Sequence, residues 1–469
     1  MFATIPNDVI QPFFRGEVSN RAAAGTTNVT GPSLIIGQGI GSGFTAGVPF
    51  RVYSPSQVDA ACRPGSQISR MMEAYLSEDP GAEIWALPLA DAGAAVAAAK
   101  PLTITGPATG DGVISLYVGG RLLSVPVTAG DSASVMGATI QAMLGVDEAA
   151  AAALGSRYAC TASNNAGVVT FTARNKGAAG NSIDLRVNYL GEAGAERMPA
   201  GVAITELASA DYVKLKSGAT DPDLSTIGAM MTDKRYQFVA NPYTVAPALT
   251  KFKTEFSDTA VGRWGYMRQT YGGVFAALND TAANMASFST ANDPHMSICG
   301  MEGTPTPADE MAAAYCGSAA ASIRIHPVVP LNNRAIRWIK PYSVEDDRLG
   351  YTERELMLRN GITPLIVSDS GDVMIQRAIT SYNKNTYGGK DDSYFDISIP
   401  YQNDYVMSRL HSVVENSMAN KVLVDNTANP RPDVPTISPK QIHSKMVAEY
   451  ADMEGMGIVE NTKVFAKLL

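Results

Sequence analysis

The chain has 469 residues, a formal net charge of −8 at pH 7, and only 17% charged residues, below the roughly 25% of an average soluble protein. Its acidic balance disfavours an overall attraction to nucleic acid or to an anionic membrane surface. The hydrophobic fraction of 45% is enough for a sizeable core, and the length suggests about three domains.

No window of about 18 consecutive apolar residues occurs, so we predict no membrane-spanning helix and no direct membrane insertion. The first residues lack the basic and apolar regions of a signal peptide, and we expect assembly in the cytoplasm. The four cysteines, Cys62, Cys160, Cys299 and Cys316, are spaced too widely for a known zinc pattern. We predict that they are buried thiols in a reducing compartment.

In chain order, residues 1–30 come first and show no sustained helical pattern. Pro6, Pro12 and Gly16 interrupt scattered apolar residues, so this segment cannot form a core of its own. We predict an N-terminal extended arm that can lie as a strand on the sheet of another chain.

Strand and helix patterns then alternate. An apolar run at 34–37, a helical spacing of apolar residues at 68–76 and an apolar run at 83–89 predict a βαβ unit. The alternation resumes near Asp221, with strands at 236–242, 266–268 and 296–299 and helices at 223–231, 249–256 and 307–322. We predict an α/β core, residues 31–100 and 211–350, whose parallel sheet is covered by helices.

Residues 101–210 have a different pattern. Gly, Asp and Asn turn signals separate short runs of β type at 102–105, 113–118, 122–127, 167–172 and 183–189, and one Ala-rich helix is predicted at 132–153. This pattern predicts a β-rich domain inserted into the core, peripheral and facing solvent.

A C-terminal domain is predicted over residues 351–469. A helix at 353–360 ends at Gly361, and strands at 362–367 and 373–380 flank a turn. Helices follow at 401–416 and 439–453. The predicted fold class is α/β (α+β overall), a multidomain protein with an α/β core, an inserted β-rich domain and an α+β C-terminal domain.

The residues of catalytic chemistry do not form recognisable motifs. The histidines His295, His326, His411 and His443 lie in no catalytic pattern, and no Gly-x-Ser-x-Gly elbow occurs. The glycine run at 37–43 lacks both the third glycine of a dinucleotide-binding loop and the lysine of a phosphate loop, which favours a connector. We predict no catalytic residue and no cofactor, so the chain is not expected to be an enzyme.

Two acidic pairs, Asp346 with Asp347 and Asp391 with Asp392, carry the oxygen ligands that a divalent cation prefers. Paired carboxylates in polar loops are far more often solvated, so we predict no metal site.

Several segments, in this order and spacing, resemble contractile tail sheath proteins of Mu-like phages over nearly the whole chain. They are 12–22 (PFFRGEVSNRA), 65–89, 351–356 (YTEREL), 360–364 (NGITP), 371–382 (GDVMIQRAITSY), 438–442 (SPKQI) and 457–461 (GIVEN). The resemblance implies a core that is subtilisin-like in architecture, and architecture does not define function. The histidines and serines of this sequence form no recognisable protease motif.

The resemblance also implies an assembly. Such subunits polymerise as stacked hexameric rings, a helical polymer around the tail tube, and contract to drive the tube through the host envelope. The implied partners are the chain itself, the tail tube protein, and baseplate and tail terminator proteins. The implied location is the tail sheath of the virion, after assembly in the host cytoplasm.

By the same resemblance, arms at both termini add strands to a neighbouring subunit by β-augmentation. We assign this role to Ile5, Val9, Ile10 and Val18 at one end and Val464, Phe465 and Leu468 at the other. Residues 464–469 are expected to begin the strand that precedes the family's C-terminal arm. Either a longer protein carries the rest of that arm, or this sheath uses a shorter linkage.

The C-terminal domain is the implied inner domain, and Lys440, Lys445 and Glu449 on its last helix are candidates to face the tube. An ordinary solvated face is an equal interpretation of these three residues. The alternatives for the whole chain are the sheath of a phage-tail-like bacteriocin or of another contractile injection system, a subtilisin-fold hydrolase, and a carbohydrate-binding or adhesin-like protein.

Overall fold

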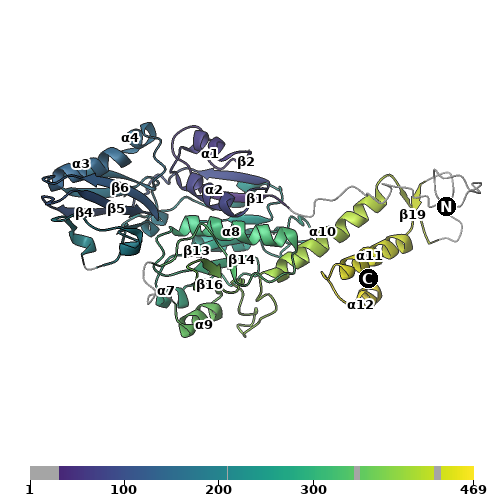
Figure 1. The fold of residues 1–469 in the computed structure, drawn as a ribbon. Coiled ribbons are helices and arrows are strands. Elements are labelled where there is room, and N and C mark those ends of the chain that lie inside the picture. The colour runs from purple at the N-terminus through teal and green to yellow at the C-terminus, as the bar shows by residue number, and fades with distance from the viewer. Residues whose placement is uncertain (1–30, 209, 343–348, 427–434) are drawn as a thin grey trace, which may run out of the picture. The chain divides into compact units, whose positions relative to one another are not determined.

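The computed structural model describes residues 31–208, 210–342, 349–426 and 435–469 (Figure 1). Chain contacts divide the protein into a larger unit, residues 31–405, and a smaller unit that includes residues 406–469. The predicted N-terminal arm, residues 1–30, lies outside the described residues.

The larger unit is built on a nine-stranded sheet with the order β15-β17-β16-β14-β13-β12-β1-β3-β2. Its six central strands are parallel: β1 (Ser33–Gln38), β3 (Ile84–Leu89), β12 (Phe238–Ala240), β13 (Gly273–Leu278), β14 (Met296–Gly300) and β16 (Ile362–Val367). The antiparallel strands at its two ends are β2 (Phe50–Val52), β17 (Val373–Ile375) and β15 (Arg334–Ala335). The sheet confirms the predicted α/β class, whereas the subtilisin-like detail stays a prediction.

Helices cover both faces of this sheet, which explains why its strands are apolar without alternation. Ile35 packs on the side of α2 (Gln67–Glu78) and α8 (Ala308–Ile325), whereas Leu34 and Ile36 pack on the opposite side with α6 (Ala246–Glu255). The remaining helices of this core are α1 (Pro55–Cys62), α5 (Ile227–Met231), α7 (Ala282–Ala286) and α9 (Tyr351–Arg359).

The structure corrects two expectations about this core. Strands β16 and β17, which we expected in a C-terminal domain from residue 351, belong to the large sheet, because Ile362 pairs in parallel register with Ile298 of β14. The strand predicted at 266–268 is a loop, and the strand of that region is β13. A Cβ at Gly273 would lie 2.8 Å from the Tyr401 hydroxyl, so the close packing at the start of β13 favours glycine.

The inserted region contains two four-stranded sheets and its own apolar core (Figure 1). One sheet has the order β10-β4-β8-β7, from β10 (Ala203–Ile204), β4 (Ala99–Thr105), β8 (Val168–Ala173) and β7 (Cys160–Asn165). The other has the order β11-β9-β5-β6, from β11 (Val213–Lys214), β9 (Asp184–Val187), β5 (Gly112–Val118) and β6 (Arg121–Val127).

The single helix predicted at 132–153 is two helices, α3 (Ala133–Leu144) and α4 (Glu148–Ala153). Gly145 ends the first helix with a φ of +91°, and the Asp147 side chain accepts a hydrogen bond from the Ala150 amide at the start of the second. A glycine in this conformation and an N-capping aspartate are ordinary helix boundaries, which the run of alanines obscured.

Polar contacts fix the insertion to the core. The fully buried Arg174 guanidinium donates to the Pro64 carbonyl at 2.7 Å and to the Ser156 carbonyl at 2.6 Å. Arg186, paired with Asp184 inside the insertion, donates to the Gly303 carbonyl of the core at 2.8 Å. The insertion is therefore braced on the core at several points, and its backbone is not free to swing.

The smaller unit is helical. Helix α10 (Ser398–Met418) runs into it, and α11 (Pro439–Gly455), α12 (Thr462–Leu468) and the strands β18 (Val422–Leu423) and β19 (Thr436–Ile437) follow. Arg409 of α10 forms an ion pair with Glu449 of α11, which joins these two helices.

Two composition-based predictions can be compared with this fold. All four cysteines are free and buried, as predicted, and burial raises the pKa of Cys62 and of Cys160 to about 12. Among the described helices, none is both long and apolar enough to cross a bilayer.

Candidate assembly surfaces

The predicted contacts of the C-terminal residues are changed by the structure. Residues 462–468 form helix α12, not the start of a strand, because the Phe465 ring stacks on Tyr450 of α11 with centroids 4.0 Å apart. Val464 and Leu468 of the same helix are exposed. The apolar side chains assigned to an arm are therefore divided, one against α11 and two toward solvent. The other predicted arm residues, Ile5, Val9, Ile10 and Val18, lie outside the described residues.

The three candidate tube-facing residues also separate. Lys440 and Lys445 are both exposed on α11, and helical geometry separates them by about 140° around the helix axis. Glu449 lies one helical turn after Lys445 on the same side of the helix, but it is half-buried and pairs with Arg409. Lys440 and Lys445 are thus exposed to a partner, whereas Glu449 is engaged by Arg409.

Strands β18 and β19 form a parallel pair of two residues each, to which the described residues add no third strand. Val422 and Leu423 are exposed. An uncovered pair of strands offers backbone groups to an added strand, so this edge is a candidate for β-augmentation. The sequence analysis did not predict β18, because a strand of two residues between polar neighbours gives no recognisable apolar pattern.

The histidines occupy separate places. His295 is buried, stacks on Trp264 with ring centroids 4.1 Å apart, and lies 3.2 Å from the Asp258 carboxylate. Its Nδ1 has no hydrogen-bond partner, and no serine or cysteine is bonded to the ring. His411 pairs with Glu415 on the surface of α10. Among the described residues, no hydrogen bond joins a serine or cysteine to the His295–Asp258 pair, so these two residues do not form a nucleophilic triad.

The other chemical candidates are accounted for locally. Gln38, within the glycine run at 37–43, bonds to Asp91 and to the Lys176 carbonyl, so this connector is held against the insertion. Asp391 accepts hydrogen bonds from Ser393 and Tyr382, while Asp346 and Asp347 lie outside the described residues. The described residues contain no group of three or more His, Cys, Asp or Glu side chains arranged for a metal ion.

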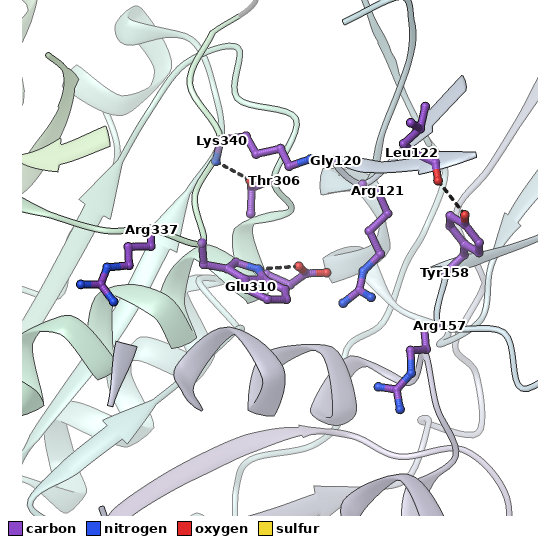
Figure 2. Close-up of a pocket in the computed structure, with 11 residues that line it drawn as sticks. Gly120, Arg121, Leu122, Arg157, Tyr158, Thr306, Glu310, Arg337 and Lys340 are labelled. Atoms are coloured by element: carbon purple, nitrogen blue, oxygen red, sulfur yellow. Dashed lines mark hydrogen bonds between the residues drawn. The ribbon is translucent and has the colours of Figure 1, made fainter. Parts of the chain in front are cut away.

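A pocket of about 550 Å³ opens between the insertion and the core, and we call it the Trp338 pocket (Figure 2). Its lining residues are Gly119, Gly120, Arg121, Leu122, Arg157, Tyr158, Thr306, Glu310, Arg337, Trp338 and Lys340. Figure 2 shows Arg121 and Arg157 of the insertion on one side of the pocket and Glu310 and Lys340 of the core on the other, while the Arg337 side chain extends away from the insertion.

The Trp338 pocket combines an aromatic floor with a basic rim. The Trp338 indole donates to Glu310 at 2.8 Å, and the Arg121 guanidinium lies 5.6 Å from its ring centroid. Arg70, fully buried beneath, pairs with Glu310 at 2.7 Å. Burial lowers the pKa of Lys340, and the nearby positive charge of Arg121 lowers it further. The Glu310 carboxylate acts in the opposite direction but does not cancel the shift.

Taken together, the mixed sheet, the braced insertion and the helical unit define a multidomain α/β protein. Residues 217–381 match the family of the phage tail sheath protein central domain. Over 471 aligned residues the chain is 28% identical to the Mu-like prophage FluMu tail sheath protein of Haemophilus influenzae (strain ATCC 51907 / DSM 11121 / KW20 / Rd), covering 100% of this chain and 92% of that protein. The likeness to phage tail sheath proteins of the Mu-like type, which the sequence motifs predicted, is thus confirmed by both comparisons.

Solved structures of similar proteins include two crystal structures of sheath tail proteins. The one from Listeria innocua has a TM-score of 0.46 and 13% identity and covers 92% of this chain and 86% of its own. The one from Desulfitobacterium hafniense has a TM-score of 0.45 and 11% identity, with coverages of 97% and 91%. The helical sheath of the anti-feeding prophage in its contracted state has a TM-score of 0.44 and 8% identity, with coverages of 96% and 85%.

Proposed function

We propose that this chain is the structural subunit of a contractile tail sheath and not an enzyme. It polymerises as stacked hexameric rings, a helical polymer around the tail tube, and contraction of this polymer drives the tube through the host envelope. The observation that carries the proposal is the relationship to a tail sheath protein along the whole chain. The subunit would reside in the tail of the virion, after assembly in the host cytoplasm.

The structure supports the mechanical part of this proposal through its rigidity. A sheath subunit must transmit force, so its body has to move as one piece while contacts between subunits rearrange. The braces from Arg174 and Arg186 join the insertion to the core at buried positions. Movement would then be concentrated in the links between subunits, for which the β18–β19 edge and the N-terminal arm are the candidates.

The contact between the sheath and the tail tube is expected to be weaker than the contacts between sheath subunits. The tail tube must slide past the sheath, and exposed ion pairs contribute only about 0–1 kcal/mol each. Lys440 and Lys445, exposed on α11, suit such a contact. Baseplate and tail terminator proteins would meet the two ends of the polymer. A sheath of a phage-tail-like bacteriocin or of another injection system would use the same subunit design.

Negative-stain electron microscopy of the purified, concentrated chain tests the proposal. Hollow striated tubes or stacked rings are expected, either from the chain alone or after addition of the tube protein. A chain that stays monomeric under both conditions would contradict the proposal and would favour the alternatives of a hydrolase or an adhesin-like protein.

Deletion of residues 1–20 tests the proposed role of the N-terminal arm. We expect a soluble monomer that no longer forms tubes, since Ile5, Val9, Ile10 and Val18 are lost while the described core is untouched. Sedimentation velocity measures the monomer, and an unchanged thermal unfolding midpoint serves as the control. Normal tubes from the deleted chain would show that this arm does not link subunits.

A further inference from the structure

The loop between α6 and β13, residues 257–269, presents three large apolar side chains to solvent. Val261, Tyr266 and Met267 are 72%, 76% and 69% exposed. Isolated exposed apolar residues are ordinary, but three within seven positions of one loop form a patch, and such patches mark interaction sites. We call residues 257–269 the Tyr266 loop.

The backbone of the Tyr266 loop is held in one conformation. A Cβ at Gly262 would lie 2.0 Å from the Ser257 carbonyl oxygen, and one at Gly265 would lie 2.0 Å from that of Thr259, so only glycine allows these turns. The loop also closes through backbone bonds from Gly262 to Thr259 and from Gly265 to Gly262.

Two buried side chains anchor this loop from below. Arg263 pairs with Glu255 at 2.8 Å and donates to the carbonyls of Thr232 and Lys234, both at 2.7 Å. Trp264 stacks on His295 and donates its indole N–H to the Gly272 carbonyl at 2.8 Å. A loop fixed in this way loses little conformational entropy on binding, which favours association.

Acidic side chains flank the exposed patch. Asp233, whose side chain is 91% exposed, lies beside the loop at 3.2 Å from Arg268. Asp258 lies within the loop and is mostly exposed. The Tyr266 loop is therefore an apolar knob with an anionic rim.

The Trp338 pocket has the opposite character. It offers an aromatic floor with four basic residues at its rim, and of these Arg337 and Lys340 form no ion pair with another described residue. Two other pockets are less basic. The one near residues 383–395, of about 740 Å³, has a mixed rim, because Glu355, Asp391 and Asp392 alternate with its basic residues. The one of about 620 Å³ between residues 186 and 211 is lined by Asp211 and by Arg186, whose charge is paired with Asp184. Charge complementarity thus favours the Trp338 pocket as the receptor for the knob.

The knob and the pocket lie on opposite sides of the large sheet. Trp264 packs against the apolar core on the α6 side, whereas Trp338 packs against the core on the α2 and α8 side. One rigid body cannot place its own loop in its own pocket across this sheet. A contact between the two surfaces must join two copies, and it would be head-to-tail, the type that generates open helical polymers.

We propose that the Tyr266 loop of one copy seats in the Trp338 pocket of the next copy and forms a lateral contact of the polymer. Tyr266 and Met267 would pack on Trp338 and Leu122, while Asp233 and Asp258 face Arg337 and Lys340. This inference rests on the proposed sheath function, because it requires that copies of the chain assemble. It names a contact between folded bodies, separate from any exchange of terminal arms.

Site-specific cross-linking of the assembled full chain tests the contact. Met267→Cys with Leu122→Cys places one thiol at the knob and one at the pocket and leaves Tyr266 and the basic rim intact. Because the four native cysteines are buried, a short bis-maleimide is expected to react at the new thiols and to yield a ladder of covalent multimers. The matched control, Met267→Cys with Tyr387→Cys, places the second thiol on an exposed loop outside the pocket and should not give a ladder.

A charge exchange gives a second, independent readout. Asp233→Lys or Arg337→Glu alone is expected to raise the concentration needed for polymerisation at least about fivefold, and the double variant should recover most of this loss. Both residues are exposed, so the thermal unfolding midpoint should not move. If the loss in the double variant equals the sum of the two single losses, the two residues do not pair.

The outcomes separate this contact from the proposed function. Tubes that form without a ladder in the Met267→Cys, Leu122→Cys variant would overturn the contact and leave the sheath function standing. If the unmodified chain forms no polymer, even with the tube protein, both proposals fall.

Discussion

At the scale of single residues, buried charges carry much of the specificity of this protein. Arg70 on α2 pairs with Asp309 at 2.8 Å and with Glu310 at 2.7 Å on α8, and all three side chains are almost fully buried. Burial by itself would lower the pKa of Arg70, but the two carboxylates raise it above its usual value. The triad fixes the register of the two helices that cover one face of the sheet.

Replacement of Arg70 by methionine tests this triad. We expect a loss of about 3–5 kcal/mol in the free energy of unfolding, because two carboxylates would remain buried without their cation. Urea unfolding followed by tryptophan fluorescence measures the change. The control is Arg197→Met, whose exposed pair with Glu192 should contribute at most about 1 kcal/mol. Similar losses in both variants would show that the triad has no special role.

A hydrogen-bonded carboxylate gives a pH prediction. Glu206 accepts from the Thr103 amide at 2.7 Å and from its hydroxyl at 2.9 Å. Burial would raise the Glu206 pKa, yet these hydrogen bonds outweigh it and lower the pKa below its usual 4.5. A lowered folded-state pKa stabilises the fold above the unfolded-state pKa, and this contribution is lost as the pH falls through the folded-state value.

We therefore expect Glu206→Gln to lower the free energy of unfolding at pH 7 by about 1 kcal/mol. The difference from the unmodified chain should shrink as the pH falls below about 4.5. Urea titrations between pH 3 and pH 7 measure it, with Glu192→Gln as the exposed control. A difference that stays constant over this range would contradict the assigned role of the carboxylate.

At the scale of elements, glycine positions separate fixed loops from tolerant ones. A Cβ at Gly265 would lie only 2.0 Å from the Thr259 carbonyl oxygen, whereas a Cβ at Gly455, at the end of α11, would meet nothing within 4 Å. Alanine at the first position must displace the loop that holds Trp264, and alanine at the second adds helix propensity without a clash.

Gly265→Ala and Gly455→Ala are therefore expected to act in opposite directions. The first should lower the thermal unfolding midpoint and shift the tryptophan emission to the red as Trp264 becomes exposed. The second should raise or preserve the midpoint, by up to about 1 kcal/mol in stability. Calorimetry and fluorescence measure both, and a tolerated alanine at position 265 would mean that the loop is not held as described.

At the scale of the whole molecule, the larger unit is expected to behave as one body because its insertion is braced by buried groups. Arg174 has no exposed side-chain surface and reaches the Pro64 carbonyl of the core, which Gly65 allows by having no Cβ in its way. Arg157 crosses the same seam to Asp59 and Glu73, but its side chain is half-exposed.

Removal of these two braces should have unequal effects. Arg174→Met is expected to cost about 3–5 kcal/mol and to speed amide hydrogen exchange on both sides of the seam, since it leaves buried acceptors without a donor. Arg157→Met should cost at most about 1 kcal/mol. Hydrogen exchange measured by mass spectrometry locates the change. If Arg174→Met does not speed exchange at the seam more than elsewhere in the chain, Arg174 is not a brace there.

The sequence by itself determined much of the local structure and the likeness to tail sheath proteins. Continuous apolar runs such as 34–37 are buried strands, because a parallel sheet covered on both faces needs no alternation. The motifs at 351–382 predicted the likeness to tail sheath proteins, since their order and spacing are properties of the chain itself. The wide spacing of the cysteines likewise predicted free, buried thiols.

Only the tertiary structure decided how distant segments meet. Strand β16 joins the core sheet because it pairs in parallel with β14, which lies more than 60 residues earlier in the chain. Helix α12 packs on α11 because the Phe465 ring stacks on Tyr450. The same holds for the buried arginine braces and for the opposite placement of the Tyr266 loop and the Trp338 pocket. These features depend on contacts between residues far apart in the chain, which local pattern does not encode.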